Sequence, residues 1–142
     1  MKLSTRSLYG LRLLYHLAGN YNNGPLQLRT VAEREDISEK YLGQIVILLR
    51  SAGIINSVRG NQGGYLLAHK PSELSVLEVV ETLEGEFLER IEDDTPVTGS
   101  SQRATREIWR RLGDSMRQVL GSVSLADLVE LSSSDAALDF VI

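Results

Sequence analysis

A glycine-rich segment between two short β-prone runs is the feature that most restricts how this chain can fold. Residues 59–64, RGNQGG, contain three glycines. The runs 54–58 and 65–68 on either side are rich in isoleucine, valine, leucine and tyrosine. Such runs, joined by a glycine-rich connection, predict a β-hairpin. The basic residue Arg59 stands at the base of its loop.

Three helical patterns precede the hairpin and one follows it. They cover about residues 3–19, 28–35, 38–53 and 75–83. Ser38 is a suitable N-cap for the third helix, and Gly53 stands where a left-handed residue would end it. Ser75 and Glu78 match the capping box that opens the fourth helix. The chain is therefore expected to be mainly α with a small β element (α+β).

The third helix has two distinct faces when its side chains are projected at about 100° per residue. One face is an apolar stripe of Leu42, Ile45, Val46, Leu49 and Ala52. The opposite face is small or polar apart from one isoleucine, and holds Lys40, Gly43, Gln44, Ile47 and Ser51. We expect the stripe to enter a core and the second face to stay exposed.

The order of these elements is the layout of a winged helix-turn-helix. A helix fits the major groove of DNA, where base edges are recognised by hydrogen bonds and methyl contacts. Lys40 and Gln44 supply polar groups on the exposed face, and Ile47 can meet a thymine methyl. The third helix is therefore predicted to be a recognition helix for double-stranded DNA.

The hairpin suits the neighbouring DNA backbone. Gly60 and Gly63 allow the chain to approach a phosphate or the minor groove, and Arg59 supplies the charge. The alternative to DNA binding is that the helix pair is an ordinary packed helical hairpin and the wing an ordinary flexible hairpin. These two interpretations would leave the charge distribution to chance. Residues 1–70 hold nine lysines and arginines against four acids, and residues 71–142 hold six arginines against fifteen acids. A basic front half is what a polyanion attracts.

The rear half contains a long helical pattern that begins near Arg103. Its apolar residues advance by three or four positions through Ile108, Leu112, Met116, Val119 or Leu120, and Val123. A stripe of this length after a complete small domain needs a partner surface, and Trp109 is interpreted as a core or dimer anchor beside it, with a ligand pocket there as the alternative. We expect three regions: a DNA-binding domain at 1–83, an acidic linker or sensor loop at 84–102, and a dimerisation helix with an apolar tail at 103–142.

Other classes of protein fit the residues less well. The chain has no cysteine, which excludes disulfides, thiolate zinc sites and cysteine-bound clusters, and no cofactor is expected. His16 and His69 stand on different elements without an acidic partner at motif spacing, so an enzyme is not expected. The acidic run 92–94 is interpreted as a solvated loop rather than a site for a hard cation. The N-terminus lacks the pattern of a secretory signal, and a cytoplasmic location is expected.

Several blocks of sequence resemble the Rrf-two (Rrf2) family of bacterial transcription regulators. They are KLSTR at 2–6, YGLR at 9–12, ISEKYL at 37–42 with Gln44, LRSAG at 49–53, SVRG at 57–60 and GGY at 63–65. The residues EG at 84–85, Trp109 and LADL at 125–128 extend the resemblance over nearly the whole chain. It implies a winged-helix homodimer that binds promoter palindromes, most simply as a repressor.

The resemblance also assigns roles to particular residues. It implies recognition-helix contacts from Ser38, Lys40, Tyr41 and Gln44, a minor-groove contact from Arg59, and phosphate contacts from Ser4, Thr5 and Arg6. It makes the helix at 103–121 the dimerisation helix.

Two departures from the family pattern limit what carries over. Many members hold an iron–sulfur cluster through three cysteines in the loop that corresponds to about residues 89–106, where this chain has none. In this respect it is similar to the members that regulate cysteine metabolism and sense through association with cysteine synthase, so a partner enzyme or a small-molecule effector is expected in place of a cluster. Gly43 stands where a glutamate is common, so base preference does not carry over. The alternative is a winged-helix protein-interaction module that uses its acidic rear half.

Overall fold

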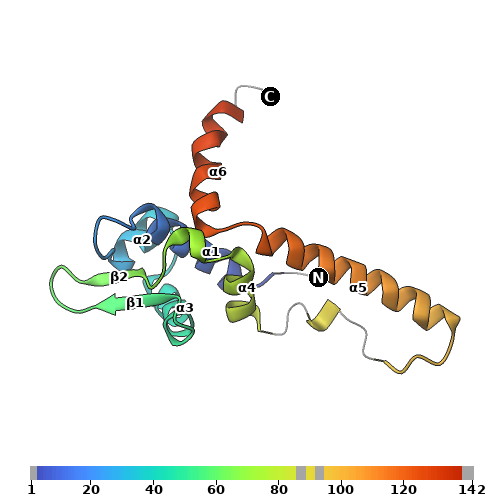
Figure 1. Cartoon of the computed structure of the whole chain (residues 1–142). Helices are drawn as coiled ribbons and strands as arrows, with labels where there is room; N and C mark the ends of the chain where they lie inside the picture. Colours follow the sequence, from blue (N-terminus) through green and yellow to red (C-terminus); the bar gives the residue numbers. More distant parts are fainter. Residues whose placement is uncertain (1–2, 86–88, 92–94, 139–142) are drawn as a thin grey trace.

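The chain folds into a helical head with a small β-wing and two C-terminal helices. The computed structural model describes residues 3–85, 89–91 and 95–138. Its elements in order are α1 (Thr5–Gly19), α2 (Leu28–Glu35), α3 (Glu39–Ser51), β1 (Ile55–Val58), β2 (Gly64–Leu67), the 3-10 turn η1 (Pro71–Glu73), α4 (Val76–Glu84), the 3-10 turn η2 (Glu89–Ile91), α5 (Ser100–Gly121) and α6 (Leu125–Leu138). Figure 1 shows α5 as a long arm that extends from the head, and α6 rises from the head in a different direction. The predicted mainly helical fold with a two-stranded wing is confirmed.

Local capping sets the ends of the third and fourth helices as predicted. The hydroxyl of Ser38 accepts a hydrogen bond of 3.2 Å from the amide of Tyr41, and Gly53 follows the end of α3 with a φ of 76°. At the start of α4 the hydroxyl of Ser75 accepts from the amide of Glu78 at 3.1 Å. A cap of this kind contributes about 1 kcal/mol to helix stability, which is why the boundaries can be predicted from a few residues.

The wing is an antiparallel hairpin that is bridged to the chain before α2 near the loop end of its strands. Ile55 pairs with Leu67, and the register continues to Val58 opposite Gly64. Leu26 forms a further bridge to Tyr65, with backbone hydrogen bonds of 2.9 and 2.8 Å in the two directions. The wing therefore has a third pairing segment beside the loop end of β2, which restricts its movement relative to α2.

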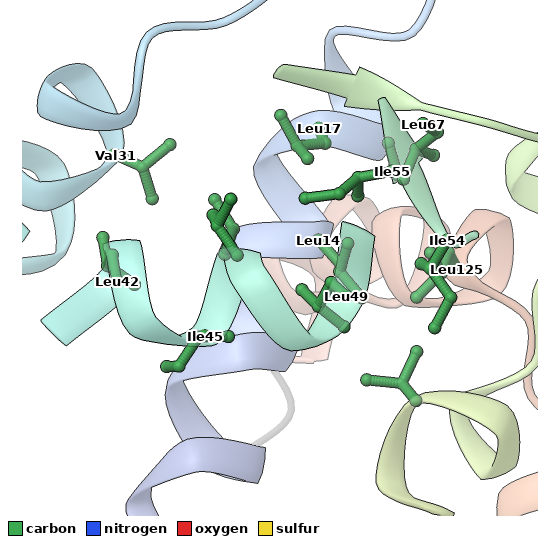
Figure 2. Close-up of a cluster of buried hydrophobic side chains, with 14 of the residues drawn as sticks. Leu14, Leu17, Val31, Leu42, Ile45, Leu49, Ile54, Ile55, Leu67 and Leu125 are labelled. Atoms are coloured by element: carbon green, nitrogen blue, oxygen red, sulfur yellow. The ribbon is translucent and has the colours of Figure 1, made fainter. Parts of the chain in front are cut away.

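One core joins the helices of the head to the wing and to α6. Figure 2 shows that the buried side chains come from α1, α2, α3, both strands and the start of α6. Leu14, Leu42, Ile45, Leu49, Ile55 and Leu125 are each 0% exposed. Burial of such a side chain contributes about 1.5–3 kcal/mol, so the elements that meet here are held together strongly.

The start of α6 packs into this head. Ser124 and Asp127 form a reciprocal capping box, with hydrogen bonds of 2.9 and 3.0 Å. The amide of Leu125 also donates to the carbonyl of Leu74 at 2.9 Å. Within the region expected at 103–142, the start of α6 joins the head core, and α5 packs in part against α4.

The stretch expected as a linker at 84–102 also contains ordered elements. Its first residue, Glu84, is the last residue of α4, η2 lies within it, and α5 begins at Ser100, three residues before the predicted start. The acidic run 92–94 and the tail 139–142 fall outside the described residues. Among the described helices, none has the length and apolar character needed to cross a membrane.

A close approach of α1 and α4 at Gly10 gives a test of this packing. A Cβ at Gly10 would overlap Cδ1 of Leu83, which is buried, whereas nothing lies near a Cβ at Gly19. We expect Gly10→Val to lower the free energy of unfolding by about 1–3 kcal/mol more than Gly19→Val, because overpacked side chains must shift. Chemical denaturation of both variants measures the difference, and equal effects would contradict this account of the α1–α4 contact.

Candidate nucleic-acid interface

The outward face of α3 is exposed as the helical projection predicts. Lys40, Gln44 and Ser51 are exposed, and Ile47 is 59% exposed although it is apolar. Gly43 is half-buried beside Leu28, at the edge of this face. Three polar side chains able to hydrogen-bond, with one exposed isoleucine, form a face suited to base edges and a thymine methyl.

Tyr41 lies at the side of this face and contacts α1. Its hydroxyl is 2.8 Å from Oγ1 of Thr5, and its ring meets the ring of Tyr9 edge-on with 5.8 Å between centroids. Ser38, which caps α3, is exposed just before it. The four residues assigned to the recognition helix therefore share the N-terminal half of α3 or precede it directly.

The wing places Arg59 at an exposed turn that needs glycine. Gly60 has a φ of 114°, a conformation that other residues rarely adopt, and a Cβ at Gly63 would overlap the carbonyl oxygen of Val58. Arg59 and Gly60 are exposed, while Gly63 is buried at the turn. The tight turn therefore presents Arg59 to solvent on a short and restricted loop.

The wing and α3 are joined too closely to move independently. The amide of Ile54, between the two elements, donates to the carbonyl of Leu49 at 3.0 Å, and its own carbonyl accepts from Ala68 at 2.9 Å. Ile54 and Ile55 are both buried in the head core. Arg59 and the outward face of α3 are consequently parts of one rigid unit.

The predicted phosphate contacts at the N-terminus differ in their surroundings. Thr5 and Arg6 are exposed. Ser4 is instead turned inward: its amide donates to Oε1 of Glu84 at 2.8 Å, and its hydroxyl donates to the same oxygen. The structure thus brings Thr5 to the start of α3, while both donors of Ser4 are committed to a carboxylate on α4.

Glu84 carries part of the family resemblance, but the sequence analysis assigned it no role in this region. It is 7% exposed and also accepts a 2.7 Å hydrogen bond from the hydroxyl of Ser7, which is fully buried. Burial opposes its ionisation, but the hydrogen bonds from Ser4 and Ser7 and the charge of Arg6 outweigh burial and lower the pKa of Glu84. A serine on the buried side of α1 was the available signal, since a buried hydroxyl needs a partner.

The predicted apolar stripe of α5 is half-buried at some positions and exposed at others. Its half-buried members in α5, which lie against α4, η2 and the N-terminal residues, are Leu112, Met116 and Leu120, and Val123, which lies just beyond the end of α5, packs with them. Its exposed members are Ile108, at 55%, Trp109, at 41%, and Val119, at 63%. An open apolar groove of about 320 Å³ runs beside Val119 and is lined also by Leu3, Ser115, Met116 and Leu120. Part of the stripe is therefore covered by the chain itself and part lies open.

The two histidines and a charged cluster on α5 lie away from the outward face of α3. Nε2 of His16 lies 2.9 Å from Oε1 of Glu35, which links α1 to α2, and His69 is exposed. On α5, Arg110 and Arg111 hold Glu107 by hydrogen bonds, which lower its pKa to about 2. Within residues 3–85, 89–91 and 95–138, no group of three or more histidines and acids is arranged to hold a metal ion.

Comparison with known proteins identifies similar transcription regulators. The family model "Rrf2: Iron-dependent Transcriptional regulator" matches residues 3–131. The HTH-type transcriptional regulator CymR of Bacillus subtilis is 36% identical over 137 residues, which are 95% of this chain and 94% of that protein. The protein rrf2 of Nitratidesulfovibrio vulgaris is 39% identical over 136 residues, 94% of this chain and 90% of that protein.

Solved structures share the fold over most of the chain. The structure of CymR, described as the global cysteine regulator of B. subtilis, has a TM-score of 0.81 and 35% identity, and the match covers 92% of this chain and 98% of that one. The structure of T. potens IscR has a TM-score of 0.78 and 35% identity, and covers 93% of this chain and 88% of that one.

The family description names iron, but this chain lacks the residues that usually bind an iron–sulfur cluster. Clusters of the usual kind need thiolate ligands, and the full sequence contains no cysteine. The exposed residues of α5 and the segment before it offer threonine, serine, arginine and glutamine instead. A cysteine-bound cluster therefore does not fit this chain.

The lowered pKa of Glu84 predicts a pH-dependent stability. Because the carboxylate ionises more readily in the folded chain, its charged form stabilises the fold above its ordinary pKa of 4.5, and this contribution is lost as the pH falls through the folded-state pKa. The free energy of unfolding of the wild type should exceed that of Glu84→Gln most at neutral pH, and the difference should shrink below pH 4.5. Urea unfolding across this range measures it. A difference that does not change with pH would contradict the prediction.

Proposed function

The chain belongs to the Rrf2 family of DNA-binding transcription regulators, and from this premise we propose that it binds promoter palindromes as a homodimeric repressor. In this proposal α3 enters the major groove and the wing reaches the neighbouring minor groove. The observation that supports it best is the rigid unit formed by α3 and the wing, in which Ile54 is hydrogen-bonded to Leu49 and to Ala68. A rigid unit can present base contacts and backbone contacts in one fixed register.

The proposed contacts follow from the exposed groups. Lys40 donates to base edges, Gln44 donates to or accepts from them, and Ile47 meets a thymine methyl. Arg59 enters the minor groove, where the exposed Gly60 allows the backbone to lie close to the duplex, and the buried Gly63 allows the tight turn that holds Arg59 there. Further contacts to phosphates come from the start of α1 and from Ser38 and Tyr41 at the start of α3.

Dimerisation is proposed through the open part of the α5 stripe. Ile108, Trp109 and Val119 are large apolar side chains exposed along one long helix, and the groove beside Val119 is apolar. A second copy of α5 laid against this surface would remove these side chains from water. The half-buried members Leu112, Met116, Leu120 and Val123 would then support the interface from the chain's own side.

The signal is proposed to come from a partner rather than from a cysteine-bound cluster. Since the chain lacks cysteine, we propose an effector molecule or a metabolic enzyme such as cysteine synthase as the sensor. The similarity to a protein described as a global cysteine regulator supports this choice. Purified cysteine synthase should shift the DNA affinity in a titration, and an unchanged affinity would favour a small molecule.

Charge substitutions test the DNA interface directly. Lys40→Ala and Arg59→Ala should each weaken binding to the operator by about 1–3 kcal/mol per subunit, and removing a cation that neutralises a phosphate should make the slope of log K against log salt shallower by about one. Fluorescence anisotropy over a range of salt concentrations measures both quantities. Lys70→Ala is the control, because Lys70 is an exposed cation outside the proposed contacts. If the wild type binds no DNA duplex at low salt, the proposal is wrong and a protein-interaction module is favoured.

Substitutions on α5 test the dimer. Val119→Asp should raise the dimer dissociation constant by about tenfold or more, because an unpaired charge would be buried at the interface. Gln118→Asp adds the same charge at the neighbouring exposed position, on a different side of the helix, and should leave the dimer intact. Analytical ultracentrifugation measures both. If the two variants have equal dimer dissociation constants, Val119 does not lie in the interface.

A further inference from the structure

Three hydrogen bonds converge on one buried oxygen where α4 meets the start of α1. Oε1 of Glu84 accepts from the amide of Ser4 at 2.8 Å, from the hydroxyl of Ser4, and from the hydroxyl of Ser7 at 2.7 Å. Ser7 is 0% exposed and Glu84 is 7% exposed. Burial of a carboxylate costs free energy unless strong hydrogen bonds compensate, so three donors to one oxygen indicate a defined geometry at this point.

This arrangement replaces the usual cap of α1. Ser4 is the N-cap residue, but its side chain makes no cap hydrogen bond to its own helix. Its hydroxyl is turned to Glu84, while the next two residues, Thr5 and Arg6, remain exposed. The direction in which the first turn of α1 presents these two residues is therefore set by a side chain from another helix, eighty residues further along the chain.

The same turn is connected to the recognition helix. The side chain of Thr5 lies 2.8 Å from the hydroxyl of Tyr41, and the ring of Tyr41 packs edge-on against Tyr9. Polar contacts thus run from the end of α4 through the start of α1 to the start of α3. α4 also packs against α5 through Val76 and Val80. Glu84 consequently belongs to the helix that packs against the arm proposed for dimerisation, and it contacts the turn of α1 that adjoins the face proposed for DNA.

We propose that Glu84 is a positioning residue for DNA binding: it holds the first turn of α1 so that Thr5 and Arg6 meet the phosphate backbone in register with α3. The inference rests on the DNA-binding surface proposed above and adds a residue that does not itself touch DNA. Its effect is on the placement of the phosphate contacts, since Glu84 and Ser7 are both buried. Gln44 and Lys40 are positioned by the core beneath α3, so their base contacts should be unchanged when Glu84 is substituted.

Two mild variants test this position. Glu84→Gln keeps the size of the side chain and one acceptor oxygen but removes the charge, and Ser7→Ala removes one buried donor at a helical position where alanine is favourable. Glu81→Gln is the matched control, because it makes the same change at an exposed position on α4. Circular dichroism and ultracentrifugation establish that each variant is folded and dimeric before binding is measured.

The expected result is a change in the salt dependence of binding. We expect Glu84→Gln and Ser7→Ala to weaken operator binding by about tenfold and to make the slope of log K against log salt shallower by about one to two, because Arg6 of each subunit no longer neutralises a phosphate. The ratio of operator to non-operator affinity should stay within about twofold of the wild type, because base contacts are intact. Reduced fold stability alone would lower the active fraction without changing the slope.

Separate outcomes distinguish this inference from the proposed function. If the wild type binds with a steep salt dependence that Arg59→Ala reduces, while Glu84→Gln and Ser7→Ala match Glu81→Gln in affinity and slope, the positioning role of Glu84 is wrong and the DNA interface stands. If the wild type binds no duplex at low salt, the proposed function fails before the variants are compared. Faster amide hydrogen exchange at residues 4–8 in Glu84→Gln, together with the shallower slope, would support the inference.

Discussion

Burial of the apolar stripe of α3 is the interaction on which the rest of the structure depends. Leu42, Ile45 and Leu49 are completely buried against α1, α2 and the base of the wing. A helix that buries one side must present the other, so the depth of this stripe in the core decides which residues face outward. The exposed positions of Lys40, Gln44 and Ile47 follow from that burial rather than from contacts of their own.

The fourth helix joins this core to the long arm. Val79 and Leu83 face the core of the head, whereas Val76 and Val80 belong to a second cluster with Leu112 and other residues of α5. A short helix with apolar residues on two sides must be held between two partners. The helix that ends at Glu84 therefore packs on both the head core and α5.

The family description names iron, whereas this chain has no cysteine to bind an iron–sulfur cluster. A fold can keep its DNA-binding architecture while the groups that sense a signal change, because the architecture depends on the core and the sensor on a few exposed ligands. Here the core residues and the wing glycines are present and the thiolate ligands are absent.

The sequence by itself determined the features that depend on neighbouring residues. The cap at Ser38, the left-handed Gly53, the two faces of α3 and the glycine turn of the wing are all governed by interactions within a few positions, and each can be predicted from the residues alone. Only the tertiary structure decided that Ser4 is turned toward Glu84, that α6 completes the head core, and that the stripe of α5 is half covered. These depend on segments far apart in the chain, whose approach is set by the packing of the whole core and leaves no periodic pattern in either segment alone.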